Sequence, residues 1–138
     1  MQPSIQPHRP APLPTERRAI LELAYEVLGV RYKYGGNSVN EGFDCSSLVQ
    51  YSHQLLNRKV PRTAAEQSRA SRTIARQQLR PGDLIFFNTT GKGVSHVGIY
   101  IKNGDFIHAA SGGGRVMVDN LSKNYWQKRI VKYGTFAG

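Results

Sequence analysis

The sequence predicts an α+β domain in which N-terminal helices pack on an antiparallel β-sheet. Two segments with apolar residues at helical spacing come first, and four β-rich segments follow them. Helices followed by strands are typical of an antiparallel sheet, whereas a parallel sheet needs helices and strands that alternate. The chain has 138 residues, of which 39% are hydrophobic. This length suits one domain with one hydrophobic core and is short for two. We therefore expect one domain.

The N-terminal segment, residues 1–14, holds five of the seven prolines. Proline lacks a backbone N–H and keeps the chain extended, so we predict a tail or linker here and a domain over residues 15–138. The segment has no apolar stretch of the kind a secretion signal needs. An extracytoplasmic location would therefore require that a leader was removed.

The first predicted helix covers residues 16–28, with Thr15 as its N-cap and Gly29 at its end. The second covers residues 45–56, and Asp44 lies at its N-cap position. Both segments repeat apolar residues every three or four positions, as an amphipathic helix does. The predicted apolar stripe of the second helix consists of Leu48, Val49, Leu55 and Leu56.

The strands are predicted after a basic region. Residues 58–80 hold seven basic residues and one acid, and a turn at Arg80-Pro81-Gly82 ends them. The β-rich segments that follow are residues 84–87, 95–101, 105–110 and 116–118. The aromatic and basic run over residues 124–134 fits a further strand packed on the sheet, with Trp126 as an anchor.

The hairpin between the second and third predicted strands decides where two histidines point. A two-residue turn would place His96 and His108 on opposite faces of the sheet. A three-residue loop over residues 102–104 places them on one face, as diagonal neighbours about 7–8 Å apart at Cβ. We predict the three-residue loop, with Gly104 in the left-handed conformation. The opposite face then carries a core stripe of Val97, Ile99 and Ile101.

The single cysteine, Cys45, lies at the predicted first turn of a helix. Unpaired N–H groups and the helix dipole favour a thiolate there, which would lower the thiol pKa and provide donors for an oxyanion. Helix position alone nevertheless favours the plainer interpretation, a small buried side chain. A nucleophilic thiol needs a base. His53 is about two helical turns away, ~12 Å, and too distant, so His96 and His108 are the candidates.

A metal site is the competing interpretation of the same side chains. Cys45, His96 and His108 could together hold zinc. The short ligand spacings of zinc sites are absent, and one cysteine excludes a multi-cysteine site. We therefore rank zinc lower and expect neither a metal nor a cofactor.

The charge of the chain points to an anionic partner. Nineteen Lys and Arg against nine Asp and Glu give a net charge of +10. Such a balance suits nucleic acid, an acidic membrane or an anionic envelope polymer. A polyanion- or RNA-binding module is therefore an alternative function, and four basic residues at near-helical spacing could form its stripe: Arg69, Arg72, Arg76 and Arg80. Interleaved aromatic residues are missing there, and no stretch approaches eighteen apolar residues, so we expect neither nucleic acid as partner nor a transmembrane segment.

Four motifs in a fixed order carry a resemblance to a known family. The run YKYGGNSVNEGFDCSSLV, residues 32–49, is similar to the glycine-rich and FDCSGLV motifs of the NlpC/p60 cysteine peptidases. PRTAAEQ (61–67), LRPGDLIFF (79–87) and SHVGIYIKNGDFIHAAS (95–111) match as well. The resemblance implies a papain-like fold. It also implies cleavage of peptidoglycan stem peptides or cross-links, at the D-Glu–diaminopimelate or D-Ala–diaminopimelate bond.

The resemblance also implies roles for the catalytic residues. Cys45 is similar to the nucleophile of this family, His96 to its general base and His108 to the residue that orients the base. Tyr32 matches the tyrosine that helps line the oxyanion site better than Tyr34 does.

Residues beside the nucleophile are implied to bind substrate. Asp44 and Ser46 match positions that often help to hold it. Ser47 replaces a glycine of the motif. We expect serine to suit a helix better than glycine does, and its side chain either to tighten the packing of the helix against the sheet or to narrow the substrate cleft.

The resemblance further implies a place of action and partners. We expect a periplasmic or secreted protein of the cell envelope, which the positive charge would concentrate on anionic envelope polymers. Related papain-like domains also catalyse thiol acyl transfer and other amide hydrolyses, so these reactions are a third alternative.

Overall fold

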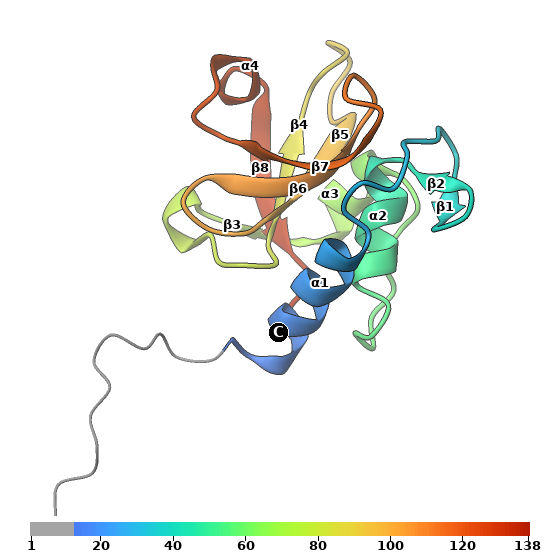
Figure 1. Cartoon of the computed structure of the whole chain (residues 1–138). Helices are drawn as coiled ribbons and strands as arrows, with labels where there is room; N and C mark the ends of the chain where they lie inside the picture. The colour runs from blue at the N-terminus through green and yellow to red at the C-terminus, as the bar shows by residue number, and fades with distance from the viewer. Residues whose placement is uncertain (1–12) are drawn as a thin grey trace, which may run out of the picture.

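The structure, a computed structural model, describes residues 13–138, so nearly all of the predicted tail lies outside the described residues. Figure 1 shows the helices α1 (Thr15–Glu26) and α2 (Cys45–Ser52) together beside a β-sheet. The other helical elements are short: α3 (Ala64–Ala70), η1 (Arg76–Gln78) and α4 (Asn124–Gln127). A two-stranded sheet, β1 (Asn37–Ser38) and β2 (Gly42–Phe43), lies between α1 and α2 in the chain.

The main sheet has six strands, and all its neighbouring pairs are antiparallel, which confirms the predicted α+β class. Its order is β3-β8-β4-β5-β6-β7. The strands are β3 (Arg72–Ile74), β4 (Leu84–Phe87), β5 (His96–Tyr100), β6 (Asp105–Ala110), β7 (Arg115–Asn120) and β8 (Ile130–Thr135). The C-terminal strand β8 lies between β3 and β4. The strand predicted within residues 124–134 is therefore only partly right, because residues 124–127 form α4.

The helix boundaries differ from the predicted ones at three places, one of which is the end of α1 at Glu26, two residues before the predicted end. Thr15 is the first residue of α1, and Pro14 holds the N-cap position without a side-chain hydrogen bond. Proline tolerates this place because the first N–H groups of a helix have no intrahelical partner. The helix α2 ends at Ser52, four residues early, and the chain then turns. Helical spacing therefore no longer applies to Leu55, which is 71% exposed instead of lying in the core stripe.

The β5–β6 hairpin has the predicted register. Its last ladder hydrogen bond runs from the N–H of Ile101 to the carbonyl of Asp105, at 2.8 Å, which leaves three residues in the loop. Two residues, Asn103 at φ 53° and Gly104 at φ 85°, adopt the left-handed conformation, whereas only the glycine was predicted to. This register puts the two histidines of the hairpin on the same face.

The sheet packs on both faces. The helices α1 and α2 cover one face, where the predicted stripe of Val97, Ile99 and Ile101 is buried. A smaller cluster of Ile85, Phe87, Phe106 and Leu121 lies on the other face. Trp126 from α4 packs against this second cluster, as an anchor on the sheet should. The histidine pair lies on this second face, beside Phe87 and Phe106.

His53, directly after α2, is fully buried. Its Nδ1 lies 2.9 Å from the carbonyl oxygen of Val49, and its Nε2 has no hydrogen-bond partner within residues 13–138. Burial lowers the pKa of His53 to about 4, although the bond to Val49 opposes this. The unfolded chain has an ordinary histidine pKa near 6.5, so it takes up a proton at a higher pH than the folded protein does. Acid therefore favours unfolding.

We expect His53 to lower the free energy of unfolding as the pH falls from about 6.5 to about 4, by at most about 3 kcal/mol. Urea denaturation of the wild type and His53→Leu at several pH values measures this. Other buried histidines contribute equally to both proteins, so the difference between the two pH slopes isolates His53. Parallel slopes would show that His53 is not the titrating group.

Candidate active site

Cys45 is the first residue of α2, as predicted, and a capping box fixes this turn. The Asp44 side chain accepts a hydrogen bond from the N–H of Ser47 at 2.9 Å, and the Ser47 hydroxyl accepts one from the N–H of Asp44 at 3.0 Å. Asp44 itself has extended backbone angles, as an N-cap residue should. The two bonds hold Cys45 at the point where the chain enters the helix.

The capping box gives Ser47 a role that the glycine of the similar motif could not have. Ser47 is buried and does not line the groove described below, so its side chain acts on the helix start rather than on the cleft. We expect Ser47→Gly to lower the free energy of unfolding by about 1–2 kcal/mol, because it removes the hydroxyl that accepts from the Asp44 N–H and adds backbone entropy to the unfolded chain. Ser47→Ala isolates the loss of this hydrogen bond and should cost less. Urea denaturation measures both, and a glycine variant as stable as the wild type would contradict this role.

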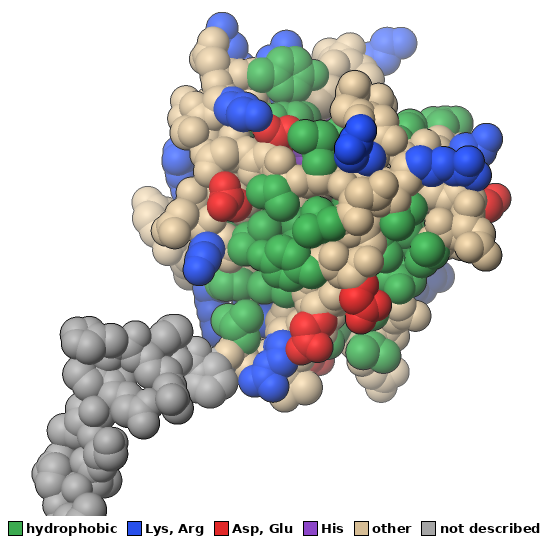
Figure 2. Space-filling model, in the orientation of Figure 1, with side chains coloured by type: hydrophobic (Ala, Val, Ile, Leu, Met, Phe, Trp, Pro, Cys, Tyr) green, Lys and Arg blue, Asp and Glu red, His purple; other side chains and the backbone are tan. Residues whose placement is uncertain are grey.

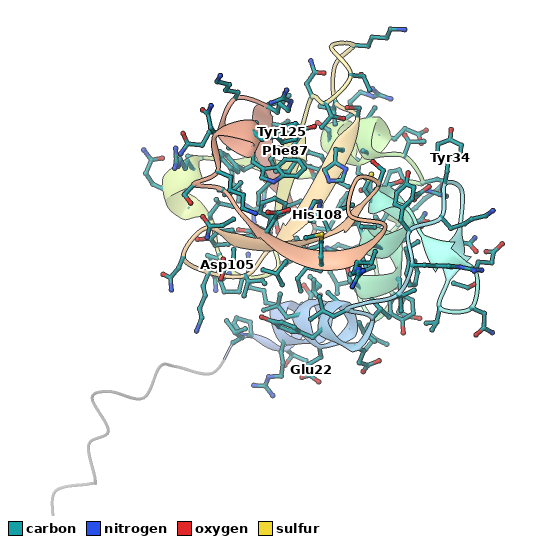
Figure 3. All side chains as sticks on the ribbon, turned by 45° about the horizontal axis from the view of Figure 1, so that its top comes forward. Glu22, Tyr34, Phe87, Asp105, His108 and Tyr125 are labelled. Atoms are coloured by element: carbon teal, nitrogen blue, oxygen red, sulfur yellow. The ribbon has the colours of Figure 1, made fainter. Side chains whose placement is uncertain are left out.

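An open groove of about 550 Å³ brings four of the predicted site residues together. Its lining includes Tyr32, Asp44, Cys45 and Ser46. Tyr34 borders it too but is 85% exposed, and in Figure 3 it projects outward at the margin of the molecule. Cys45 as a residue is partly exposed and lines this groove, so it is not wholly buried.

The thiol of Cys45 is protonated at rest. Burial is the main cause that raises its pKa to about 11, and the Asp44 carboxylate adds to this, while the N–H groups of Val97 and of the helix start act in the opposite direction. The expectation that the helix start would lower this pKa was therefore wrong, because the loss of solvation outweighs the helix N–H groups. A base must remove the proton when the thiol reacts.

His96 and His108 form the predicted pair. His96 Nε2 and His108 Nδ1 are 2.8 Å apart, and the two rings are nearly perpendicular. His108 is completely buried, and Figure 3 shows it in the interior. Burial, and then His108, lower the pKa of His96 to about 3, so this ring is neutral at physiological pH. Trp126 stacks on His96 with its centroid 5.5 Å away.

The backbone of β5 brings His96 next to the cysteine. Ser95, just before it, lines the groove of Cys45, and the N–H of Val97, just after it, acts on the thiol. Among the described residues Cys45 and His96 share no hydrogen bond. Catalytic hydrogen bonds are often long before substrate binds and tighten in the complex. The histidines line a second hollow of about 410 Å³, together with Thr89, Ser111, Asp119 and Trp126.

Two side chains that contact the predicted site residues were missed in the sequence. Arg62 donates to both carboxylate oxygens of Asp44, at 2.8 and 3.0 Å, and to the Ser46 hydroxyl at 2.9 Å. Asp119 Oδ2 lies 3.1 Å from His108 Nε2. Asp119 was missed because the predicted strand stopped at residue 118, whereas β7 extends to Asn120.

The basic residues predicted to form a polyanion-binding stripe lie on different elements of the fold. Arg69 lies in the last turn of α3, Arg72 is in β3 and Arg76 begins η1, so these residues do not form the stripe of one helix. On the face seen in Figure 2, basic side chains are scattered around the rim and hydrophobic ones gather at the centre. Within residues 13–138 no three His, Cys, Asp or Glu are grouped to hold a metal ion. None of the helices in this range is long and apolar enough to cross a bilayer.

Comparisons with known proteins agree with the geometry. The model of the NlpC/P60 family matches residues 29–135. Murein DD-endopeptidase MepH of Escherichia coli is 43% identical over 75% of this chain, and the bifunctional muramidase/DL-endopeptidase CwlT of Bacillus subtilis is 37% identical over 83%. The matches span 40% and 35% of those two proteins. A lipoprotein-like NLP/P60 protein of Staphylococcus aureus, known from a crystal structure, superimposes with a TM-score of 0.81 and 30% identity, over 96% of this chain and 45% of that one.

Proposed function

The chain belongs to the NlpC/P60 family, and from this we propose that it hydrolyses amide bonds of peptidoglycan peptides with Cys45 as the nucleophile. The observation that carries the proposal is the partly exposed cysteine at a helix start, in a groove adjoining a hydrogen-bonded histidine pair. Relatives named as murein and DL-endopeptidases support the substrate class. We place its action in the cell envelope for the same reason.

The proposed reaction is acyl transfer to sulfur. His96 takes the proton of the Cys45 thiol, and the sulfur attacks the amide carbonyl carbon. His96 then gives this proton to the leaving amine as the C–N bond breaks, which leaves a thioester on Cys45. Water attacks the thioester while His96 accepts its proton, the C–S bond breaks, and His96 returns the proton to the Cys45 sulfur as the acid product leaves. His108 orients His96 through the 2.8 Å contact.

The oxyanion is proposed to form between the start of α2 and Tyr32. The first N–H groups of the helix are donors without an intrahelical partner. Burial, and then the neighbouring Cys45, raise the pKa of Tyr32, so its hydroxyl keeps its proton and can donate it in a hydrogen bond. Tyr32 is held in place by its N–H, which donates to the carbonyl of Gly114 at 2.8 Å.

Asp44, Ser46 and Arg62 are proposed to bind the part of the substrate beside the scissile bond. Burial opposes ionisation of Asp44, but hydrogen bonds from Arg62 and from the N–H of Ser47 outweigh it and lower its pKa. The carboxylate is therefore charged at neutral pH and borders the groove together with a guanidinium. Such a pair offers both signs of charge to a zwitterionic peptide end.

A cross-linked muropeptide dimer tests this function, because it contains both the D-Glu–diaminopimelate and the D-Ala–diaminopimelate bond. Mass spectrometry of the products shows whether cleavage occurs and at which of the two bonds. We expect fragments of one of these cleavages with the wild type and an intact dimer with Cys45→Ala. A dimer that stays intact with the wild type would overturn the proposed function.

The net charge of +10 favours a second candidate, the polyanion- or RNA-binding module. Binding of single-stranded RNA at several salt concentrations separates the two. A binding module predicts affinity that falls steeply with salt and is the same in Cys45→Ala. The peptidase predicts cleavage that is lost in Cys45→Ala.

A further inference from the structure

Asp119 ends a chain of hydrogen bonds that begins at His96. His96 Nε2 lies 2.8 Å from His108 Nδ1, and His108 Nε2 lies 3.1 Å from Asp119 Oδ2. The other carboxylate oxygen, Oδ1, accepts from Lys123 Nζ at 2.6 Å. We propose that Asp119 is a positioning residue that fixes the tautomers of both histidines, so that His96 carries no hydrogen on Nδ1 and can act as a base. This inference rests on the proposed function.

The sheet register places Asp119 for this contact. His108 lies opposite Met117 in the β6–β7 ladder, and Asp119 is two residues further along β7, on the same face as His108. The β-turn that follows brings Lys123 back over the carboxylate. The Asp119 side chain is only 10% exposed, so solvent screens its contact with the fully buried His108 weakly. The carboxylate is thus held by strand pairing, not by a loop.

The donor and acceptor roles along the chain follow from the carboxylate. Burial opposes ionisation of Asp119, but the hydrogen bonds from Lys123 and His108 outweigh it and lower its pKa, so the carboxylate only accepts. His108 must therefore carry a hydrogen on Nε2. Burial lowers the pKa of His108 more than Asp119 raises it, so the ring is neutral and its Nδ1 has a lone pair. That lone pair accepts the Nε2–H of His96, and the neutral His96 ring has no hydrogen left for Nδ1.

A carboxamide at position 119 would reverse these roles. Lys123 can only donate, so it would hold the amide oxygen and turn the amide NH₂ toward His108. His108 would then accept at Nε2 and donate from Nδ1. His96 would accept at Nε2 and carry its hydrogen on Nδ1, where it blocks proton transfer from the thiol. The substitution changes one atom of the side chain and hardly changes its volume.

Kinetics on the muropeptide dimer test this with the full chain. We expect Asp119→Asn to lower kcat about 100-fold with KM within about twofold, because a base in the wrong tautomer loses rate rather than substrate binding. Adding Lys123→Met lets the carboxamide turn its oxygen to His108 and should restore kcat about tenfold. Asp105→Asn is the matched control: Asp105 also accepts from a neighbouring side chain, Asn120 at 2.8 Å, but is not part of the histidine chain. Its kcat should stay within about twofold of the wild type.

Nitrogen-15 NMR of the histidine rings supplies a readout that does not depend on activity. The wild type should show both rings with the hydrogen on Nε2, and Asp119→Asn should show it on Nδ1. Wild-type kcat in Asp119→Asn, or unchanged tautomers, would overturn the inference while leaving the peptidase intact. A tautomer exchange in a protein that cleaves no muropeptide would instead support the hydrogen-bond chain and refute the proposed function.

Discussion

Cys45→Ala is expected to lower the rate of muropeptide cleavage by at least about 10⁴-fold, because the chain has no second thiol to form the covalent intermediate. Tyr32, Asp44 and Ser46 still border the groove in the variant, so substrate binding should persist. Cys45 is a small residue that is not wholly buried, and the capping box does not use its side chain. We therefore expect the free energy of unfolding to change by less than about 1 kcal/mol.

The measurement combines initial cleavage rates with urea denaturation of the same samples. Cys45→Ser is the matched control for shape, since it keeps a hydroxyl at this position. Its alkoxide forms less readily than a thiolate, so its rate should also fall far below that of the wild type. An alanine variant that folds normally and cleaves at the wild-type rate would rule out the covalent mechanism.

The largest expected effect on stability is at an ion pair that joins α1 to the sheet. Arg17 and Asp83 are 2.8 Å apart, with side chains 3% and 1% exposed. Arg17 also donates to the carbonyl of Pro81 at 3.0 Å, and Asp83 accepts from the N–H of Arg80 at 2.7 Å. The pair thus ties the first helix to the turn that precedes β4.

We expect Arg17→Met to lower the free energy of unfolding by about 3–5 kcal/mol, because it leaves the Asp83 carboxylate buried and unpaired. The double variant Arg17→Met/Asp83→Leu removes both charges and should be more stable than the single one. Urea denaturation of both proteins measures the difference. Arg58→Met is the control, because its ion pair with Glu16 is solvent-exposed and should contribute less than about 1 kcal/mol. An Arg17→Met variant whose free energy of unfolding falls by less than about 1 kcal/mol would contradict this role.

Local signals account for the parts of the fold that could be predicted from the sequence. The strands β4 and β6 have the predicted bounds, because their β-rich runs end at turn residues. The start of α2 follows from Asp44, whose side chain caps the helix as expected. The histidine pair followed from one loop length, since a single-residue shift of register would have separated the rings.

Non-local packing accounts for the parts that could not. The strand β3 is short and mostly exposed, so it lacks an apolar pattern, and β8 contains a register shift opposite Phe86 and Phe87 that breaks its alternation. Its place between β3 and β4 depends on pairing across the whole chain. The thiol pKa of Cys45 depends on burial beneath residues distant in sequence, and the helix position alone predicted the wrong direction.

The nucleophile can be tested most directly through the fact that the chain has one cysteine. Intact-protein mass spectrometry during treatment with iodoacetamide gives the alkylated fraction of Cys45, and cleavage assays on the same aliquots give the remaining activity. We expect the remaining activity to equal the unmodified fraction at every time point, and a muropeptide present in excess to slow both changes. Protein that is completely alkylated and still cleaves the dimer at its original rate would contradict the assignment of Cys45.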